Sequence, residues 1–312
     1  MAAARALSVG HATVVVVNVA EEVVSESLAA LACEAPHRVL RTLTAGGSGA
    51  WVFLLELPTG RAVLKVTEDP AWLRRARREL GVYRELAGTL GVVVPAVIAA
   101  HSDRGVIRLL LAEHTPYPPA PAVTDLEWTA LADQLGRLHH PPDPAPPWLE
   151  HRPWPGSDQL AQAVDWWTAR GFGALARRAT ELIAVGHELD GIAPRVITHG
   201  DCHVGNLLRS DRGDTVWVDW QEVCLSSGFL DLAFLWQRAE FAGATPPREA
   251  MWEAYLTTRG LRPDLNPRSL IGVAELLLLL LAWPSYLHHG SKPQQELVTH
   301  RLGQLVGELT GS

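Results

Sequence analysis

Residues 197–236 read ITHGDCHVGNLLRSDRGDTVWVDWQEVCLSSGFLDLAFLW. In this stretch Asp201 and Asn206 lie five positions apart in a polar segment, and Asp219 follows thirteen positions later at the end of an apolar run. The β-branched residues within 195–198 predict a strand, and the residues that follow are too polar to continue it as a buried strand. We therefore expect Asp201 to lie in a loop at a strand end.

A hairpin is predicted immediately after this loop. Two short apolar runs, 207–208 and 216–218, flank the charged turn at 210–214, which contains a glycine. Pairing of the two runs would return Asp219 to the neighbourhood of Asn206. Three side chains that bear oxygen atoms would then converge on one place in the fold.

Convergence of these side chains has a chemical meaning. Mg²⁺ prefers hard oxygen ligands, with water and phosphate completing its coordination. Phosphoryl transfer also needs a carboxylate near the acceptor hydroxyl, in addition to the ligands of the metal that bridges the phosphates. Asp201 suits the first role, and Asn206 and Asp219 suit the second. The spacing therefore predicts a site for a magnesium–nucleotide complex.

Three ordered blocks of the stretch carry a resemblance to a known family: HGDCHVGN at 199–206, VDW at 218–220 and DLA at 231–233. Together they resemble the signature of the aminoglycoside phosphotransferase and choline kinase family, whose members have a protein-kinase-like fold and phosphorylate small-molecule alcohols. The resemblance implies that Asp201 is the catalytic base and that Asn206 and Asp219 bind Mg²⁺. It also implies that His199 and Asp231 brace the catalytic loop.

A lysine lies within an apolar strand of the N-terminal half. The runs WVFLLEL at 51–57 and AVLKV at 62–66, with a short turn between them, predict two paired strands. Lys65 has apolar neighbours, and a lysine is seldom placed there unless its ammonium group finds a partner. By the resemblance, Lys65 holds the nucleotide phosphates and pairs with Glu79 in the helix predicted at 72–87.

A glycine-rich turn precedes these strands. Residues 41–49 read RTLTAGGSG, and such a turn lets backbone N–H groups approach phosphate oxygens without interference from Cβ atoms. We assign Gly46, Gly47 and Ser48 to the nucleotide-binding site on this basis.

The boundary between two lobes is predicted next. The segment VVVP at 92–95 resembles the following strand of the family, and the apolar run at 106–111 predicts another strand. A cluster of prolines after it stiffens the chain and marks a hinge. By the resemblance, backbone groups near Glu113 and Thr115 bind the purine edge of the nucleotide.

The C-terminal half is predicted to be mainly helical, with helices near 124–139, 158–190, 251–259 and 270–281. Twelve tryptophans are many for a chain of this length, so an aromatic acceptor pocket is expected in addition to core packing. We assign Trp220, Trp236, Glu222 and Glu240 to the acceptor site as candidates.

Two alternatives of other classes remain at this point. His199, Asp201 and His203 have the spacing HxDxH, which also suits Zn²⁺ or Fe²⁺ in a metallohydrolase. That enzyme would need no nucleotide, and Lys65 would be dispensable. A pseudokinase would bind a ligand without turnover. The presence of the lysine, its glutamate, the base and both metal ligands favours an active kinase.

The composition of the chain indicates which classes of molecule it can bind and which compartment suits it. The net charge is −7, and four arginines between 74 and 78 form the largest basic cluster, so nucleic acid is disfavoured as the main partner. The acidic balance suits a cationic or neutral small-molecule acceptor. Three cysteines, at 33, 202 and 224, show no CxxC spacing, which favours a reducing cytoplasm. The longest apolar run, 276–283, is too short to span a bilayer.

The N-terminal segment, residues 1–36, has no clear counterpart in the family. We expect its valine run, Val14 to Val17, to be a strand or extended segment, followed by an amphipathic helix at 21–32 that caps the first lobe. Residues 37–115 are then expected to form the nucleotide-binding lobe, and residues 116–312 the helical lobe with the catalytic loop and acceptor site.

The expected fold is α+β: a two-lobed protein-kinase-like fold, with an N-terminal antiparallel sheet and a mainly helical C-terminal lobe. The expected reaction moves the γ-phosphoryl group of ATP or GTP, with Mg²⁺, to a hydroxyl of a small molecule. An antibiotic, an aminoglycoside or another natural product, is the first acceptor expected, and a metabolic amino alcohol or sugar is the second. We expect a monomer or homodimer.

Overall fold

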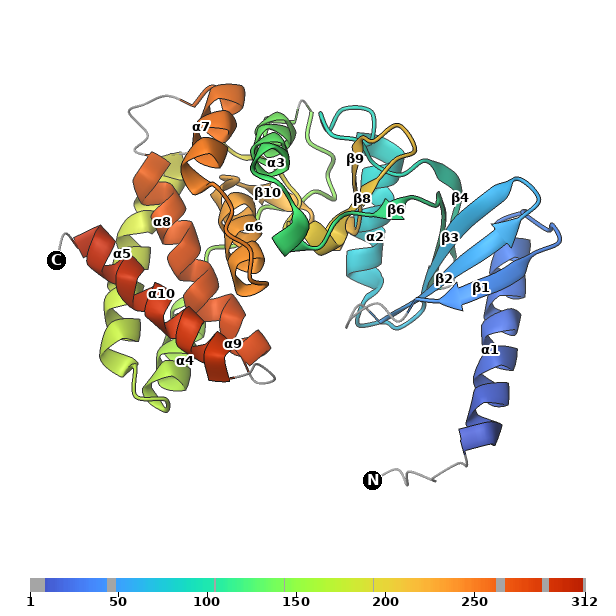
Figure 1. The fold of residues 1–312 in the computed structure, drawn as a ribbon, viewed down its shortest axis with the longest axis horizontal. Helices are drawn as coiled ribbons and strands as arrows, with labels where there is room; N and C mark the ends of the chain where they lie inside the picture. The colour runs from blue at the N-terminus through green and yellow to red at the C-terminus, as the bar shows by residue number, and fades with distance from the viewer. Residues whose placement is uncertain are drawn as a thin grey trace.

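A five-stranded antiparallel sheet forms the first lobe of the computed structural model, and helices dominate the second (Figure 1). The structure describes residues 9–43, 49–103, 105–142, 144–192, 194–261, 267–287 and 292–310. The strands follow the order β1-β2-β3-β5-β4. Their bounds are β1 (Arg38–Thr42), β2 (Ala50–Leu57), β3 (Gly60–Thr67), β4 (Val97–Asp103) and β5 (Val106–Ala112). The α+β, two-lobed architecture predicted from the sequence is confirmed.

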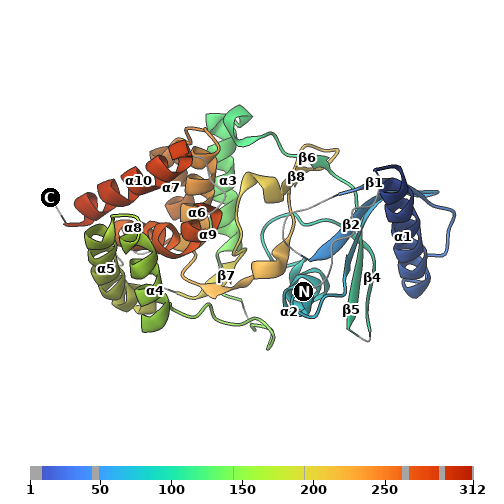
Figure 2. The same ribbon diagram turned by 90° about the horizontal axis from the view of Figure 1, so that it is seen from below.

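Helix α1 (Val9–Ala30) lies on the outer side of the sheet, away from the helical lobe (Figure 2). Val24 and Leu28 are buried in one hydrophobic cluster with Phe53 of β2. The strand expected over Val14 to Val17 is therefore wrong, because that run belongs to the same continuous helix. β-Branched residues are only mildly unfavourable in a helix, and packing of a helical face overrides that preference.

Alternation along β3 divides its side chains between two faces. Leu64 and Val66 are buried in the cluster with α1, so Lys65 points to the opposite face of the sheet. That face is covered by α2 (Leu73–Gly81), which continues through one π-helical turn, Val82–Leu86. The side chain of Lys65 is thereby directed toward the junction of the two lobes.

The strand expected at 92–95 is wrong. Val93 makes one isolated bridge with Val216, and the strand that joins the sheet is β4, after Pro95. Proline has no N–H group to donate to the hydrogen bonds between strands, so the strand that pairs in the sheet begins after it.

Helices build the second lobe: α3 (Asp125–Leu138), α4 (Ser157–Thr168), α5 (Gly173–Ile192), α6 (Phe229–Phe241), α7 (Arg248–Arg259), α8 (Pro267–Leu277), α9 (Trp283–Leu287) and α10 (Lys292–Thr310). A capping box of Thr124 and Glu127 begins α3. The helix expected at 158–190 is two helices, because the chain turns at Gly171, which has a φ of 87°. No helix within the described ranges has the length and hydropathy needed to cross a membrane.

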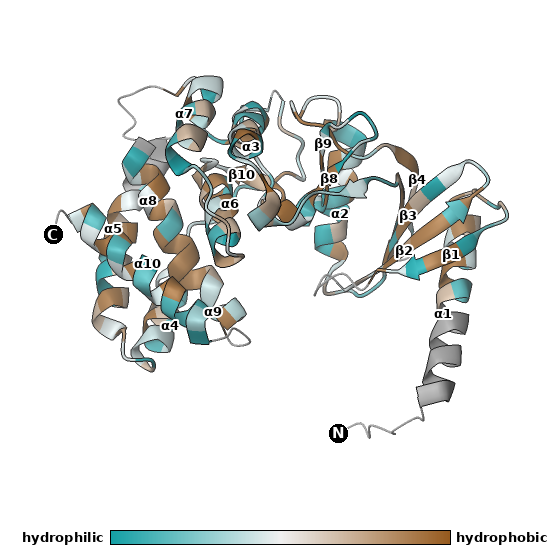
Figure 3. Cartoon of the chain, viewed as in Figure 1, coloured by the Kyte–Doolittle hydropathy of each residue, from teal (hydrophilic) through white to brown (hydrophobic). Residues whose placement is uncertain are grey.

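Two small sheets accompany the helices of the second lobe. The predicted hairpin is confirmed as β8 (Leu207–Arg209) paired with β9 (Thr215–Trp217), and β6 (Thr115–Pro116) joins its edge. Strand β7 (Val196–Thr198) pairs with β10 (Cys224–Ser226). Apolar side chains of α2 and of the helical lobe form one continuous core, and hydrophobic residues concentrate along β2, β3 and α8 (Figure 3).

Candidate active site

The loop that carries Asp201 begins where β7 ends. Gly200 has a φ of 83°, and a Cβ atom at this position would lie 2.1 Å from the backbone oxygen of Glu222. Only glycine fits both the conformation and the space. The chain then forms a short 3-10 turn, Val204–Asn206, before β8. The sequence HGD therefore places Asp201 immediately after a turn that requires glycine.

Asp231, in the first turn of α6, fixes the backbone of this loop. Its carboxylate accepts hydrogen bonds from the N–H groups of His199, at 2.6 Å, and Gly200, at 2.9 Å. His139 Nε2 donates to the same carboxylate at 3.2 Å, and Tyr255 Oη donates to His139 Nδ1 at 2.9 Å. Burial alone would raise the pKa of Asp231, but the hydrogen bond from His139 and the positive charges around the carboxylate together outweigh it, and the pKa lies below the ordinary value.

His199 uses both ring nitrogens within the protein. Nε2 donates to the backbone oxygen of Val218 at 2.9 Å, and Nδ1 accepts from the N–H of Asp201 at 3.3 Å. Among the residues that the structure describes, no group of three His, Cys, Asp or Glu side chains could hold a metal ion. The HxDxH metal site therefore has no support, because His199 holds the loop and does not face a shared centre with His203.

The Asp201 carboxylate is hydrogen-bonded but remains at the surface of a cleft. Asn206 Nδ2 donates to the backbone oxygen of Asp201 at 2.9 Å and to its Oδ2 at 3.0 Å, and His203 Nε2 lies 3.7 Å from Oδ2. Partial burial raises the pKa of Asp201, but His203 and Asn206 lower it further, so the net pKa lies below the ordinary value. The group is ionised at neutral pH and can accept a proton.

Lys65 lies between two carboxylates. Its Nζ is 2.8 Å from Glu79 on α2 and 2.8 Å from Asp219 after β9, so the predicted pairing with Glu79 is present. Burial lowers the pKa of Lys65, but the two carboxylates raise it more, and the ammonium stays charged. Asp219 has a φ of 65°, a left-handed conformation rare for residues other than glycine, asparagine and aspartate. This conformation turns its carboxylate back toward Lys65.

Asn206 and Asp219 offer the oxygen ligands that Mg²⁺ prefers. The Nδ2 group of Asn206 is occupied by Asp201, which leaves its carbonyl oxygen as the free end of the amide. The backbone oxygen of Asn206 accepts a hydrogen bond from Val218 at 3.0 Å, so the hairpin holds both residues beside each other, as expected. The donor set fits a hard divalent cation completed by phosphate and water.

The residues assigned to the nucleotide differ in how far the structure describes them. Glu113 and Thr115 lie in the segment that joins β5 to the helical lobe, and Thr115 Oγ1 donates to the backbone oxygen of Arg209 at 3.1 Å. Gly46, Gly47 and Ser48 lie outside the described residues.

The four residues assigned to the acceptor separate into different places. Glu222 lines the cleft beside Asp201 and pairs with Arg75 at 2.8 Å. Trp220 is 0% exposed, and its indole N–H donates to the Trp217 backbone oxygen. Trp220 is therefore a core residue and not an acceptor contact, because the hairpin packs its ring inward.

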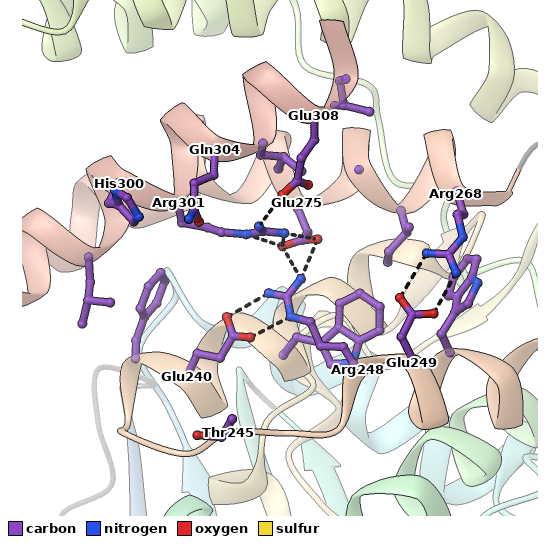
Figure 4. Close-up of a pocket in the computed structure, with 18 of the residues that line it drawn as sticks. Glu240, Thr245, Arg248, Glu249, Arg268, Glu275, His300, Arg301, Gln304 and Glu308 are labelled. Atoms are coloured by element: carbon purple, nitrogen blue, oxygen red, sulfur yellow. Dashed lines mark hydrogen bonds and ion pairs between the residues drawn. The ribbon is translucent and has the colours of Figure 1, made fainter. Parts of the chain in front are cut away.

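Trp236 and Glu240 line a second cavity of about 820 Å³ between α6, α7, α8 and α10 (Figure 4). Glu240 forms two hydrogen bonds with Arg248 there, and Arg248 also pairs with the buried Glu275. None of these residues lines the cleft of Asp201. The assignment of Trp236 and Glu240 to the acceptor site is therefore wrong. Both residues line the other cavity, and the charge of Glu240 is paired with Arg248.

The sequence predictions missed several side chains of the cleft, which encloses about 760 Å³. They are Arg152, Phe234, Arg238 and Tyr286. Phe234 and Arg238 are three and seven positions after Asp231, so helical periodicity from the DLA block could have placed them on the same face of α6.

A sheet lobe and a helical lobe that meet at a lysine–carboxylate cluster and a braced aspartate loop define the class of kinase-like phosphotransferases. Residues 39–265 match the model of the phosphotransferase enzyme family. This chain belongs to that family and is therefore a phosphotransferase. A search of curated protein sequences gave no significant match.

Solved structures share the fold at low sequence identity. A macrolide 2'-phosphotransferase from Brachybacterium faecium is 21% identical, with a TM-score of 0.61 and coverage of 90% of this chain and 97% of that chain. A microcompartment-associated aminopropanol kinase is 17% identical, with a TM-score of 0.63 and coverage of 92% and 95%. A spectinomycin phosphotransferase solved with ADP and spectinomycin is 12% identical, with a TM-score of 0.59 and coverage of 90% and 92%.

Proposed function

We propose that this protein transfers the γ-phosphoryl group of ATP, or of GTP, to a hydroxyl group of a natural product, and that antibiotics are its acceptor class. The observation that carries the proposal is the position of Asp201, ionised and at the surface of a cleft that also contains Asn206 and Asp219. Resistance or self-protection would be the biological consequence. The unpaired cysteines suit a reducing compartment, the cytoplasm.

In the proposed reaction Asp201 orients the acceptor hydroxyl and accepts its proton as the oxygen bonds to the γ-phosphorus. The bond between that phosphorus and the β–γ bridging oxygen breaks, and the nucleoside diphosphate leaves with the bonding electron pair. Lys65, held by Glu79, binds phosphate oxygens. Mg²⁺ on Asn206 and Asp219 would neutralise the charge of the phosphates.

The size of the cleft supports a natural product over a small metabolite. The cavity of about 760 Å³ lies within the range of drug-sized ligand sites. Besides Asn206 and Asp219, its lining includes Phe234, Arg238 and Tyr286 of the helical lobe, which leaves room for an acceptor beside the phosphates. An amino alcohol such as the substrate named for the aminopropanol kinase would fill only a small part of it. A metabolic amino alcohol or sugar therefore remains the second candidate.

Nucleotide-dependent thermal stabilisation tests the first half of the proposal. We expect ATP or GTP to raise the melting temperature only with Mg²⁺, and consumption of the nucleotide in the presence of one class from a panel of macrolides, aminoglycosides, other antibiotics, amino alcohols and sugars. Asp201→Asn should keep the thermal shift and lose consumption. A wild-type protein that binds no nucleotide with Mg²⁺ would refute the proposed function.

A further inference from the structure

The carboxylates of the cleft are all engaged within the protein. Asp219 pairs with Lys65, and Glu222 pairs with Arg75. Asp231 is buried against the loop backbone. The fourth carboxylate in the cleft, that of Asp201, is the one proposed to face the reacting hydroxyl. Among the described residues that line this cleft, no carboxylate is left over to bind an ammonium group of an acceptor.

Arg238 is a charged residue of the cleft that, unlike these carboxylates, is not engaged by an opposite charge among the described residues. It is half-buried, it lines the cleft, and it has no ion pair with any carboxylate among the described residues. Its guanidinium lies 5.2 Å from the ring centroid of Tyr286 on α9 and 5.9 Å from that of Phe234 on α6. These aromatic contacts hold the group in place without neutralising its charge.

The arginines of the second cavity offer a comparison, because each is paired with carboxylates. Arg248 pairs with Glu240 and Glu275. Arg301 pairs with Glu275 and Glu308 (Figure 4). A half-buried guanidinium without such a partner keeps its hydrogen-bonding capacity for a group that arrives from outside.

Arg238 lies two turns of α6 after Asp231, the residue that holds the loop of Asp201. It can therefore contact a part of the acceptor that is distant from the reacting hydroxyl. Asp231 holds the loop of Asp201, Phe234 is one turn further and meets the His203 ring at 6.1 Å, and Arg238 follows after another turn. Seven residues of α-helix span on the order of 10 Å. An acceptor with its hydroxyl at Asp201 would extend past an aromatic wall to Arg238.

We infer that the acceptor carries a carboxylate group, bound by Arg238 on the order of 10 Å from the hydroxyl that receives the phosphoryl group. The inference rests on the proposed function. The planar guanidinium can bind a carboxylate through two parallel hydrogen bonds. An acidic natural product with an aromatic or apolar body fits this cleft, whereas a polycationic aminoglycoside meets an unneutralised positive charge there.

The test uses a matched pair of rigid probes, 4′-(hydroxymethyl)biphenyl-4-carboxylate and the corresponding carboxamide. Their affinities for the protein saturated with Mg²⁺ and ADP are measured by calorimetry, and their phosphorylation with ATP is measured in parallel. We expect the carboxylate to bind the wild type at least about tenfold more tightly than the carboxamide. The variant Arg238→Gln should lose that preference and keep its thermal shift with Mg²⁺ and ATP.

Arg170→Gln is the matched control, because Arg170 also lies against an aromatic ring, with its guanidinium 3.4 Å from the Trp166 ring centroid, but is exposed and outside the cleft. Its preference for the carboxylate should equal that of the wild type. Equal affinity of the wild type for both probes, or a preference that survives in Arg238→Gln, overturns the inference. Failure of the proposed function is distinguishable, because the wild type would then show no shift with Mg²⁺ and ATP.

Discussion

Lys65 Nζ donates a hydrogen bond of 2.8 Å to Asp219 Oδ1, although the two residues are 154 positions apart in the chain. The bond joins strand β3 of the sheet lobe to the end of the hairpin in the helical lobe. Lys65, which we propose binds the nucleotide phosphates, and Asp219, which we propose binds Mg²⁺, are thus held in one cluster. This arrangement makes the site sensitive to the loss of a single charge.

Lys65→Ala should lower the free energy of unfolding by on the order of 3–5 kcal/mol, because it leaves the Glu79 carboxylate, 2% exposed, without a counter-charge. Chemical denaturation measures the change. The double variant Lys65→Met with Glu79→Leu should recover most of the loss, since neither charge then remains buried.

An exposed ion pair provides the control for Lys65. Arg268 and Glu249 lie 2.7 Å apart with side chains 68% and 70% exposed, and solvent screens their attraction. Arg268→Ala should leave the denaturation midpoint almost unchanged. If Lys65→Ala is equally neutral, the ion pair with Glu79 does not stabilise the fold.

Asp201→Asn should reduce kcat by roughly 10²–10⁴-fold with little change in nucleotide affinity, because the amide keeps the shape of the side chain but accepts no proton. Steady-state kinetics and nucleotide titration measure the two effects separately. Asp211→Asn, in the exposed hairpin turn, is the matched control and should change neither kcat nor the nucleotide affinity. A joint loss of turnover and nucleotide binding would show that Asp201 supports the nucleotide site itself.

Protonation of Asp231 should lower the free energy of unfolding at acidic pH. Burial raises its pKa, but His139, His199 and Arg152 together lower it more, to a net value below the ordinary 3.8, so the unfolded chain binds this proton more readily than the folded chain. Its contribution is therefore fully present above about pH 3.8 and is lost as the pH falls through the lower folded-state pKa. The stability difference between wild type and Asp231→Asn, followed by urea unfolding, should shrink in that range. A difference that stays constant from pH 7 to pH 3 would contradict this role.

Leu28→Ala tests whether α1 is part of the sheet lobe. Leu28 is 2% exposed in the cluster with Phe53 and Leu64, so its truncation should cost about 2–5 kcal/mol of stability. Leu126→Ala removes the same atoms from a side chain that is 80% exposed, and it should change stability by less than about 0.5 kcal/mol. Equal effects of the two variants would mean that α1 is not packed on the sheet in solution.

Local patterns predicted much of the site. The turn before Asp201 and the hairpin after Asn206 depend on residues within a few positions of each other, so their geometry is set by turn chemistry and backbone hydrogen bonds. The apolar neighbours of Lys65 likewise indicated a buried partner. The family resemblance supplied the identity of that partner, Glu79.

Long-range packing decided what local patterns left open. Whether Trp220 faces the core or the cleft, and whether Glu240 meets a ligand or Arg248, depends on which face of an element the neighbouring helices cover. The valine run near the N-terminus joined a helix because residues further along that helix are buried against the sheet.

By itself, the sequence determined the family, the two-lobed class of fold and the order of the chemical groups in the catalytic loop, because these depend on residue types at short spacing. Only the tertiary structure decided which charges remain unpaired. Arg238 resembles the other arginines of the helical lobe until its neighbours in space are known, and the lack of a described carboxylate beside it follows from how α6 and α9 pack around the cleft. A charge is neutralised by what lies within a few ångströms of it, and distance along the chain does not determine that.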